Sequence, residues 1–204
     1  MIGIVDYGLG NVQAFVNIYK RLNIAASLVS TAESLAHVDH IILPGVGSFD
    51  WAMQRLQRTG LRQVLDHQVL EKNIPVLGVC VGMQMMARSS QEGSEPGLGW
   101  IDAEVRRFSF TSDYNHLILP HMGWNDVTSV RSSSLLDHLN SESRFYFLHS
   151  YYFSPGHELD VIATSNYGGD FACAVHSSNC YGVQFHPEKS HGWGTQLLKN
   201  FAEI

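Results

Sequence analysis

The fold is decided by the stretch Pro75-Val-Leu-Gly-Val-Cys80-Val-Gly-Met-Gln84. Residues 75–79 are apolar and uncharged, which is typical of a strand buried on both faces, and the residues after Cys80 are good helix formers. Between them, the run Gly78–Gly82 has the form G-x-C-x-G, the thiol counterpart of the G-x-S-x-G nucleophile elbow. The glycines leave room for a sharp turn that would hold the Cys80 sulfur at a helix N-terminus, where the dipole favours a thiolate. By itself the motif also fits a buried structural cysteine between two packing glycines.

A candidate base for this thiol lies near the C-terminus, where the strand-like run 180–185 leads directly into His186-Pro-Glu188. Pro187 favours an extended conformation at the residue before it, and residues two apart in an extended chain point to the same side. We therefore expect His186 to face the thiol and Glu188 to lie behind its ring, as nucleophile, base and orienter of the base. Taken singly, the two residues also fit a structural histidine and a surface carboxylate.

Length and composition limit the possible functions. The chain has 204 residues, which suits one domain with a substantial core, and we expect residues 1–204 to form a single domain. The formal charge of −6 and the scattered Lys and Arg residues argue against nucleic acid and anionic membranes as partners. No apolar run approaches the ~20 residues of a membrane span, and the N-terminus starts as a strand without a signal-peptide pattern.

The chain contains three cysteines, Cys80, Cys173 and Cys180, whose spacing fits no disulfide framework. Reduced thiols and a cytoplasmic location are therefore expected, with the second and third cysteines in structural roles. A metal site built from His186, Glu188 and His191 fits no standard zinc spacing. We expect neither a metal nor a cofactor.

Strand and helix patterns alternate through the first part of the chain. Strands are expected at 2–5, 24–29 and 40–43, and helices at 12–22, about 49–56 and about 61–71. This alternation predicts a parallel sheet covered by helices. The Gly-rich turn 6–11 does not complete the dinucleotide-binding pattern G-x-G-x-x-G, because Gln13 stands where the third glycine would be.

Beyond Gln91 the pattern changes to closely spaced strands, expected at 100–108, 117–119, 124–127, 144–153, 161–165 and 171–176. Only a short helical piece near Leu135 and a closing helix at about 194–202 interrupt them. We infer an α/β fold with a mostly parallel central sheet, flanked by helices and joined to an antiparallel strand region.

In such sheets ligands gather outside the carboxyl ends of the strands. The turns at 8–11 and 44–47, the Cys80 elbow and the run 186–188 all follow predicted strands. They should converge on one edge and form one active site.

A thiolate with a histidine base performs acyl transfer. Its tetrahedral oxyanion needs preorganised donors. The N–H of Val81 is one candidate, and the glycine-flanked backbone of Val46 and Gly47 is the other. Without the elbow, residues 44–47 would be interpreted as a plain tight turn.

The motifs 44–47, 78–84 and 184–188 resemble those of the class I glutamine amidotransferases, which use a Cys-His-Glu triad to release ammonia from glutamine. Narrower signals span nearly the whole chain: Asp6-Tyr-Gly-Leu-Gly-Asn11, Pro120-His-Met-Gly-Trp-Asn125, Phe145-Tyr-Phe-Leu-His-Ser-Tyr-Tyr152 and His186-Pro-Glu-Lys-Ser190. Together they resemble the glutaminase subunits of imidazole glycerol phosphate synthase, of histidine biosynthesis. The resemblance implies a flavodoxin-like amidotransferase fold.

The resemblance also implies a site and a partner. Glutamine would be bound by Gly47, Gln84, Glu92 and the backbone of His149, Ser150 and Tyr151. The partner interface would include Asn11, Trp124, Asn125 and Lys189. The partner would be a (β/α)8-barrel cyclase subunit, bound as a heterodimer. It would use the ammonia to form imidazole glycerol phosphate and an aminoimidazole carboxamide ribotide.

Because the chain shows no second acceptor site, we expect low basal activity that rises when the cyclase binds its ligand. Backbone movement at 45–47 would complete the oxyanion hole. Two alternatives stay open. The same glutaminase chemistry could feed a sugar amidotransferase of surface-polysaccharide synthesis, or the chain could be a catalytically silent partner protein.

Overall fold

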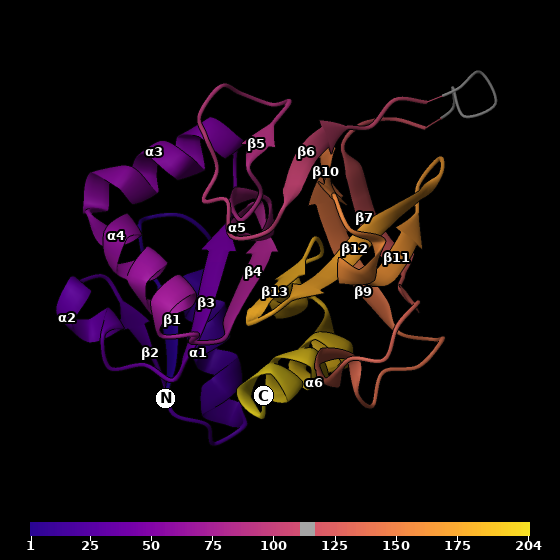
Figure 1. Ribbon diagram of the computed structural model, residues 1–204. Coiled ribbons are helices and arrows are strands. Elements are labelled where there is room, and N and C mark those ends of the chain that lie inside the picture. The colour runs from indigo at the N-terminus through magenta and orange to yellow at the C-terminus, as the bar shows by residue number, and fades with distance from the viewer. Residues whose placement is uncertain (111–116) are drawn as a thin grey trace.

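The computed structural model describes residues 1–110 and 117–204 (Figure 1). Within them, an 11-stranded sheet follows the order β2-β1-β3-β4-β13-β12-β10-β6-β5, with β11 paired to β12 and β8 paired to β11. A separate two-stranded sheet pairs β7 with β9. The first five strands of the order are mutually parallel, and 2-1-3-4 followed by the next parallel strand is the order of flavodoxin-like folds. The predicted α/β fold is therefore confirmed.

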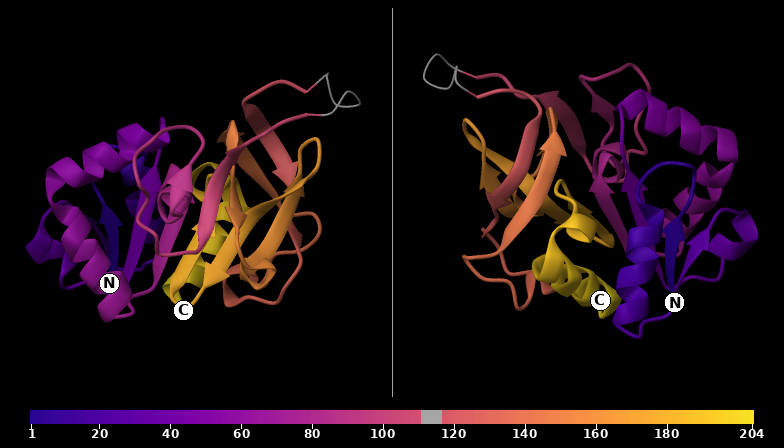
Figure 2. Two further views of the ribbon diagram at one scale, coloured as in Figure 1. Left: turned by 45° about the horizontal axis from the view of Figure 1, so that its top comes forward. Right: turned by 180° about the vertical axis from the view of Figure 1, so that it is seen from behind.

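The parallel strands are β1 (Ile2–Val5), β2 (Ala26–Val29), β3 (His40–Gly45), β4 (Val76–Cys80) and β13 (Cys180–Val183). The helices are α1 (Val12–Arg21), α2 (Ala32–Leu35), α3 (Phe49–Thr59), α4 (Leu61–Asp66), α5 (Val81–Met85) and α6 (His191–Ala202). A π-helical turn, η1 (His67–Glu71), continues α4. In the right-hand view of Figure 2, α1 and α6 lie side by side on one face of the sheet, while α3 and α4 cover the other.

Burial on both faces explains the apolar composition of these strands. Every residue of β1, β4 and β13 is buried. Helix α1 buries Phe15, Ile18 and Tyr19, the i, i+3, i+4 spacing of one helix face. The Tyr19 hydroxyl donates to the Leu198 carbonyl at 2.9 Å and so ties α1 to α6.

The antiparallel region contains β6 (Ala103–Arg107), β7 (His121–Asp126), β8 (Thr128–Ser129), β9 (Arg144–His149), β10 (Tyr151–Pro155), β11 (Val161–Asn166) and β12 (Asp170–Ser177). Strand β5 (Ser89–Ser90) pairs with β6 in parallel. Short 3₁₀ turns lie at η3 (Ser134–Leu136), η4 (Glu158–Asp160) and η5 (Pro187–Lys189).

Three sequence predictions in this region need correction. Residues 117–119 are not a strand: Ile118 is 76% exposed, and its carbonyl accepts from the Tyr167 hydroxyl instead of a neighbouring strand. The strand expected at 124–127 begins earlier, at His121. The single strand expected at 144–153 is two strands, β9 and β10, separated at Ser150.

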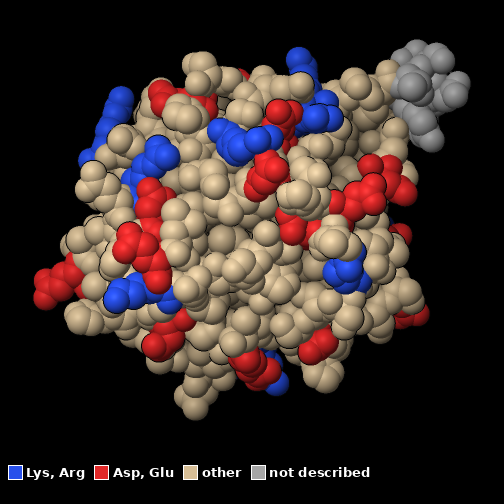
Figure 3. All heavy atoms as spheres, in the orientation of Figure 1, with Lys and Arg blue, Asp and Glu red and all other residues tan. Residues whose placement is uncertain are grey.

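None of the described helices has both the length and the apolar character needed to cross a bilayer. On the face drawn in Figure 3, acidic and basic side chains are interspersed around a largely uncharged centre. The described part of that face carries no basic patch suited to nucleic acid.

Candidate active site

Cys80 occupies a strained turn, as the G-x-C-x-G pattern predicts. It is the last residue of β4 and the N-cap of α5, with φ 55° and ψ −114°. A positive φ is rare outside glycine, and such strain costs about 1–3 kcal/mol and is concentrated at functional sites. The side chain is buried at 3% exposure, between the end of the sheet and the first turn of the helix.

The flanking glycines are required by contacts with backbone. A Cβ on Gly82 would lie 1.9 Å from the Leu43 oxygen, and one on Gly45 would lie 2.3 Å from the Gly82 nitrogen. A Cβ on Gly78 would lie 2.7 Å from the Met83 Cα. The turn after β3 therefore packs directly on the elbow, which brings residues 44–47 beside the nucleophile.

The Gly-rich turn at 8–11 supports the site from behind and does not line it. The Tyr7 hydroxyl donates to the Pro44 carbonyl at 2.6 Å, and a Cβ on Gly10 would lie 3.0 Å from the Pro44 Cβ. Three of the four turns expected at the sheet edge thus form the site, and the fourth positions one of them. Tyr7 was not predicted as a site residue, because its role depends on a contact between two distant turns.

His186 and Glu188 meet as predicted, although by a different local path. Nδ1 of His186 lies 2.9 Å from Oε1 of Glu188, and both side chains are 3% exposed. His186 is extended, with φ −101° and ψ 95°, but residues 187–189 form the 3₁₀ turn η5 and not an extended strand end. Ser190 secures the turn, because its hydroxyl donates to the His186 carbonyl at 2.6 Å and accepts from the Tyr146 N–H at 3.0 Å.

The charges around His186 favour its protonated form. Burial lowers its pKa, but hydrogen bonds to Cys80 and Glu188, together with their negative charges, outweigh this and raise the pKa to about 10. An imidazolium between a sulfur and a carboxylate is the arrangement that activates a cysteine nucleophile.

A cavity of about 300 Å³ opens in front of the thiol. Its lining comprises Val46, Gly47, Cys80, Val81, Gln84, Glu92, Pro120, Leu148, His149, Ser150, Tyr151, His186 and Lys189. The structure thus gathers every residue predicted for the oxyanion hole and for substrate binding around one space. Glu188 lies behind His186, while Asn11, Trp124 and Asn125 lie outside the cavity.

A glutamine pair, Gln84 and Gln184, links the thiol to the cavity wall. Nε2 of Gln184 lies 3.8 Å from the Cys80 sulfur, and its Oε1 accepts from Nε2 of Gln84 at 3.0 Å. Gln84 also donates to the Tyr151 carbonyl at 3.1 Å. Gln184 is fully buried and was not predicted as a site residue, although a glutamine in an apolar strand just before His186 is a usable signal.

Glu92 forms the opposite rim. Its Oε2 accepts from the Phe49 N–H, at the start of α3, at 2.8 Å. Burial raises the pKa of this carboxyl, although the hydrogen bond from Phe49 opposes the shift. The rim therefore presents one carboxylate to the cavity.

Comparison with known proteins identifies the family. The sequence model of the family Glutamine amidotransferase class-I matches residues 3–204. The chain is 55% identical over 204 residues to the imidazole glycerol phosphate synthase subunit HisH of Bdellovibrio bacteriovorus, and 52% identical over 204 residues to that of Leptospira interrogans, with 100% of both chains covered each time. The chain belongs to the HisH family of class I glutamine amidotransferases.

Solved structures share the fold of this amidotransferase at low sequence identity. A glutamine amidotransferase crystal structure superimposes with a TM-score of 0.75 at 20% identity, covering 100% of this chain and 99% of that one. The structure of PurLQS from Thermotoga maritima gives a TM-score of 0.73 at 15% identity, covering 99% of this chain and 97% of that one. These likenesses concern the fold alone.

Two buried histidines of the amidotransferase, His121 and His149, lie next to the cavity wall. Their rings meet in an edge-on, T-shaped arrangement, with Nδ1 of His121 3.0 Å from Nε2 of His149. Burial lowers the pKa of His121 to about 4 and the pKa of His149 to about 3. Both rings are therefore neutral at physiological pH.

This histidine pair should make the amidotransferase sensitive to acid. In the unfolded chain both residues titrate near 6.5, so below that pH the unfolded state binds more protons than the folded state. The contribution of the pair to the free energy of unfolding is complete above about pH 6.5 and is lost as the pH falls toward the pKa values of the folded state. Near pH 5 the two histidines together should lower the free energy of unfolding by about 2.7 kcal/mol per pH unit. Urea unfolding at several pH values measures this slope.

The variant His121→Asn isolates one member of the pair. Asparagine does not titrate, so the slope near pH 5 should fall by about 1.4 kcal/mol per pH unit. An unchanged slope would show that His121 is not kept neutral by the fold.

The predicted interface residues of the amidotransferase differ in their surroundings. Trp124 is 41% exposed and stacks on His191, with ring centroids 5.2 Å apart, and Nζ of Lys189 lies 5.7 Å from the centre of the Tyr146 ring. Asn11 is exposed on the turn before α1. Met122, on the same side of β7 as Trp124, is 61% exposed and was not predicted.

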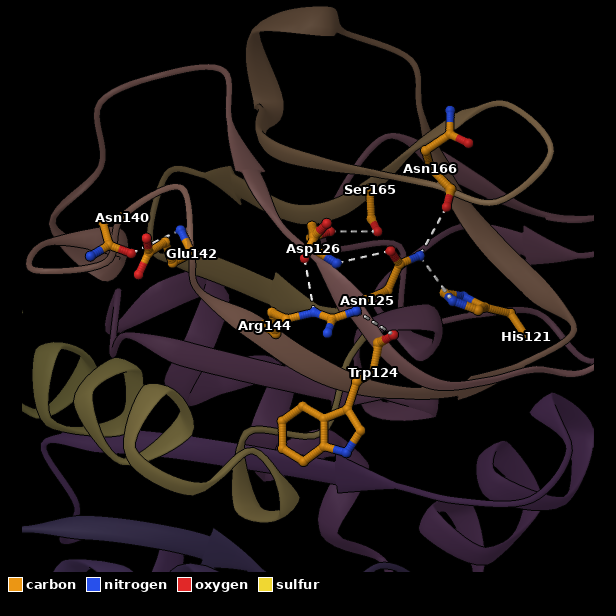
Figure 4. Close-up of polar contacts among 9 residues, drawn as sticks. All are labelled: His121, Trp124, Asn125, Asp126, Asn140, Glu142, Arg144, Ser165 and Asn166. Carbon is orange, nitrogen blue, oxygen red and sulfur yellow. Dashed lines mark hydrogen bonds and ion pairs between the residues drawn. The ribbon is translucent and has the colours of Figure 1, made fainter.

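Asn125 points inward in the close-up of Figure 4. Its Nδ2 lies 3.1 Å from Nε2 of His121 and 2.8 Å from the Asn166 carbonyl, and its Oδ1 accepts from the Asp126 N–H at 2.8 Å. All hydrogen-bonding groups of this amide therefore have partners within the chain.

Proposed function

We propose that this amidotransferase hydrolyses glutamine to glutamate and ammonia through a thioester on Cys80, with His186 as acid and base and Glu188 as the residue that orients it. The observation that carries the proposal is the cysteine on a strained elbow, in one cavity with a buried histidine whose Nδ1 lies 2.9 Å from a carboxylate oxygen. A catalytically silent protein would not need the strained cysteine, the buried histidine and the carboxylate to lie together.

The proposed reaction uses the Cys80 sulfur as nucleophile and His186 as the proton carrier. The Cys80 thiolate attacks the side-chain carbonyl of glutamine, and the oxyanion accepts hydrogen bonds from the Val81 N–H and from the backbone of Val46 and Gly47. His186 gives its proton to the amide nitrogen, ammonia leaves, and the thioester remains. The now neutral His186 takes a proton from water, the hydroxide attacks the thioester, and glutamate leaves as the ion pair is restored.

The cavity suits a free amino acid. Its volume of about 300 Å³ is at the lower end of small-molecule sites. Gln84, Gly47 and the backbone of residues 149–151 would hold the glutamine, and the Glu92 carboxylate would pair with its α-ammonium group. Gly47, with φ +87°, allows the oxyanion backbone to reorient when the site is activated.

We further propose that the chain acts as one domain in a heterodimer with a (β/α)8-barrel cyclase subunit of the histidine pathway, in the cytoplasm. The relatives' name, a subunit of imidazole glycerol phosphate synthase, supports such a partner. The exposed Met122 and Trp124, with Lys189 at the cavity rim, mark the side on which it would bind. All three cysteines are free thiols, which fits a reducing compartment.

The test is ammonia release from glutamine by the chain alone and with a histidine-pathway cyclase, with and without the cyclase ligand. We expect low basal turnover and a rise of about 5–150-fold with the liganded partner, the range of ordinary allosteric coupling. Equal turnover in all three conditions would contradict the partnership. Turnover that responds only to a sugar-amidotransferase partner would move the acceptor to polysaccharide synthesis.

A further inference from the structure

A single chain of hydrogen bonds runs from β7 to the cavity wall. Nδ2 of Asn125 lies 3.1 Å from Nε2 of His121, Nδ1 of His121 lies 3.0 Å from Nε2 of His149, and Nδ1 of His149 lies 2.8 Å from the Tyr151 carbonyl oxygen. It joins β7, β9 and β10, which belong to two different sheets.

The chain has one possible direction. A carbonyl oxygen can only accept, so Nδ1 of His149 carries the hydrogen and its Nε2 accepts. His121 must then donate from Nδ1 and accept at Nε2, where only the amide nitrogen of Asn125 can donate. Each neutral ring is thus held in one tautomer, and each of its nitrogens has a partner. The lowered pKa values of both rings agree with this assignment.

Packing fixes His121 as firmly as the hydrogen bonds do. Its ring is stacked between Phe147, at 4.8 Å between centroids, and Tyr167, at 4.1 Å, and the side chain is 3% exposed. These contacts and the hydrogen bonds at both nitrogens hold the ring in one orientation, and Figure 4 shows the Asn125 amide between His121 and Asn166.

The chain ends at the junction of two strands in the cavity wall, where the Ser150 carbonyl accepts from the Phe108 N–H at 3.3 Å. Strand β9 ends at His149 and β10 begins at Tyr151, so Ser150 lies in neither strand. The Tyr151 oxygen accepts from His149 on one side and from Nε2 of Gln84 on the other, which uses both of its lone pairs. This oxygen belongs to the Tyr151–Tyr152 peptide, whose orientation is thereby set from β7, through the two histidines, and from α5.

We propose that Asn125, His121 and His149 are positioning residues that hold the Tyr151 carbonyl, and with it the cavity wall at Ser150 and Tyr151, in place for glutamine. The inference rests on the proposed glutaminase function and deepens it. It also assigns Asn125 an inward role, while Met122 and Trp124 on the opposite side of β7 face outward.

The decisive comparison is His121→Phe against His121→Asn. Phenylalanine keeps the stacked ring but leaves Nε2 of His149 without a donor, whereas the asparagine amide nitrogen can donate from the position of Nδ1. With the liganded cyclase at saturation, we expect His121→Phe to raise the KM for glutamine about tenfold and His121→Asn to stay within about threefold of the parent chain. Asn166→Ala is the matched control and should leave KM unchanged, because its main-chain oxygen remains.

Alkylation of Cys80 by iodoacetamide separates positioning from damage to the triad. His121→Phe should keep the alkylation rate within about twofold of the parent chain, because the triad does not include His121. A KM within about twofold of the parent chain in His121→Phe, or an equal loss in His121→Asn, would overturn the proposal. A fall in the alkylation rate of His121→Phe as large as its loss of glutamine affinity would also overturn the proposal. If His121→Phe does not fold, Asn125→Ala tests the proposal instead. We expect it to raise the KM for glutamine about threefold, and an unchanged KM would overturn the proposal.

Glutamine binding to the Cys80→Ala chain separates this inference from the proposed function. If the parent chain does not turn over glutamine, the proposed function fails. The positioning role is then judged by calorimetry, where adding His121→Phe should weaken glutamine binding about tenfold.

Discussion

Replacing Cys80 with alanine is expected to abolish ammonia release from glutamine, with a loss of about 10⁴-fold or more in kcat. Alanine keeps the Cβ and the strained backbone but removes the sulfur, so no thioester can form. The measurement is ammonia production in the presence of the liganded cyclase, with the thermal midpoint recorded to confirm that the variant is folded.

Cys180→Ala is the matched control for this substitution. Cys180 is also buried in the sheet, as the first residue of β13, but burial raises the pKa of its thiol to about 12, so it is neutral and unreactive. Its loss should leave kcat within about threefold of the parent chain. Wild-type turnover by Cys80→Ala would show that another group performs the chemistry.

Replacing Gly82 with alanine is expected to lower the free energy of unfolding by about 3–5 kcal/mol, a large effect for a single methyl group. The added Cβ would lie 1.9 Å from the Leu43 oxygen and 2.8 Å from the Leu43 carbonyl carbon. These are backbone atoms of β3, so neither a rotamer change nor a small shift can relieve the clash. Urea unfolding at pH 7 measures the loss.

Gly192→Ala is the matched control. Gly192 lies in α6, and a Cβ there would meet nothing within 4 Å. Alanine is the better helix former, so stability should stay constant or rise by up to about 1 kcal/mol. Equal stability of Gly82→Ala and the parent chain would mean that the elbow does not pack on β3.

Much of the site could be predicted because its chemistry is encoded locally. The apolar run 75–79 is typical of a strand buried on both faces, and the glycines around Cys80 mark a turn in which a Cβ would clash with backbone. His186 and Glu188 were also predicted to meet. They do, but through the turn η5 and not along an extended strand, because Ser190 bonds back to the His186 carbonyl.

The misplaced elements all lie where pairing joins distant parts of the chain. The apolar run 144–153 gives no sign of its break at Ser150, which arises because β9 pairs with β7 and β10 pairs with β6 and β12. Residues 117–119 have strand-like composition but pair with no strand of the described ranges. Hydrophobic periodicity and strand propensity are properties of one segment, whereas a hydrogen-bonded β-ladder requires a second segment at the right distance.

The sequence by itself determined the parallel α/β core, the elbow and the family resemblance, and it predicted the proposed Cys80, His186 and Glu188 triad, because these depend on residue types at short spacing. Only the tertiary structure decided that Tyr7 supports Pro44, that Gln184 contacts the thiol, and that Asn125, His121 and His149 form one directed chain. Buried polar groups must find partners, and a partner can be as far along the chain as Leu198 is from Tyr19, 179 residues. Their choice is therefore made by the packing of the whole chain and not by any one stretch of it.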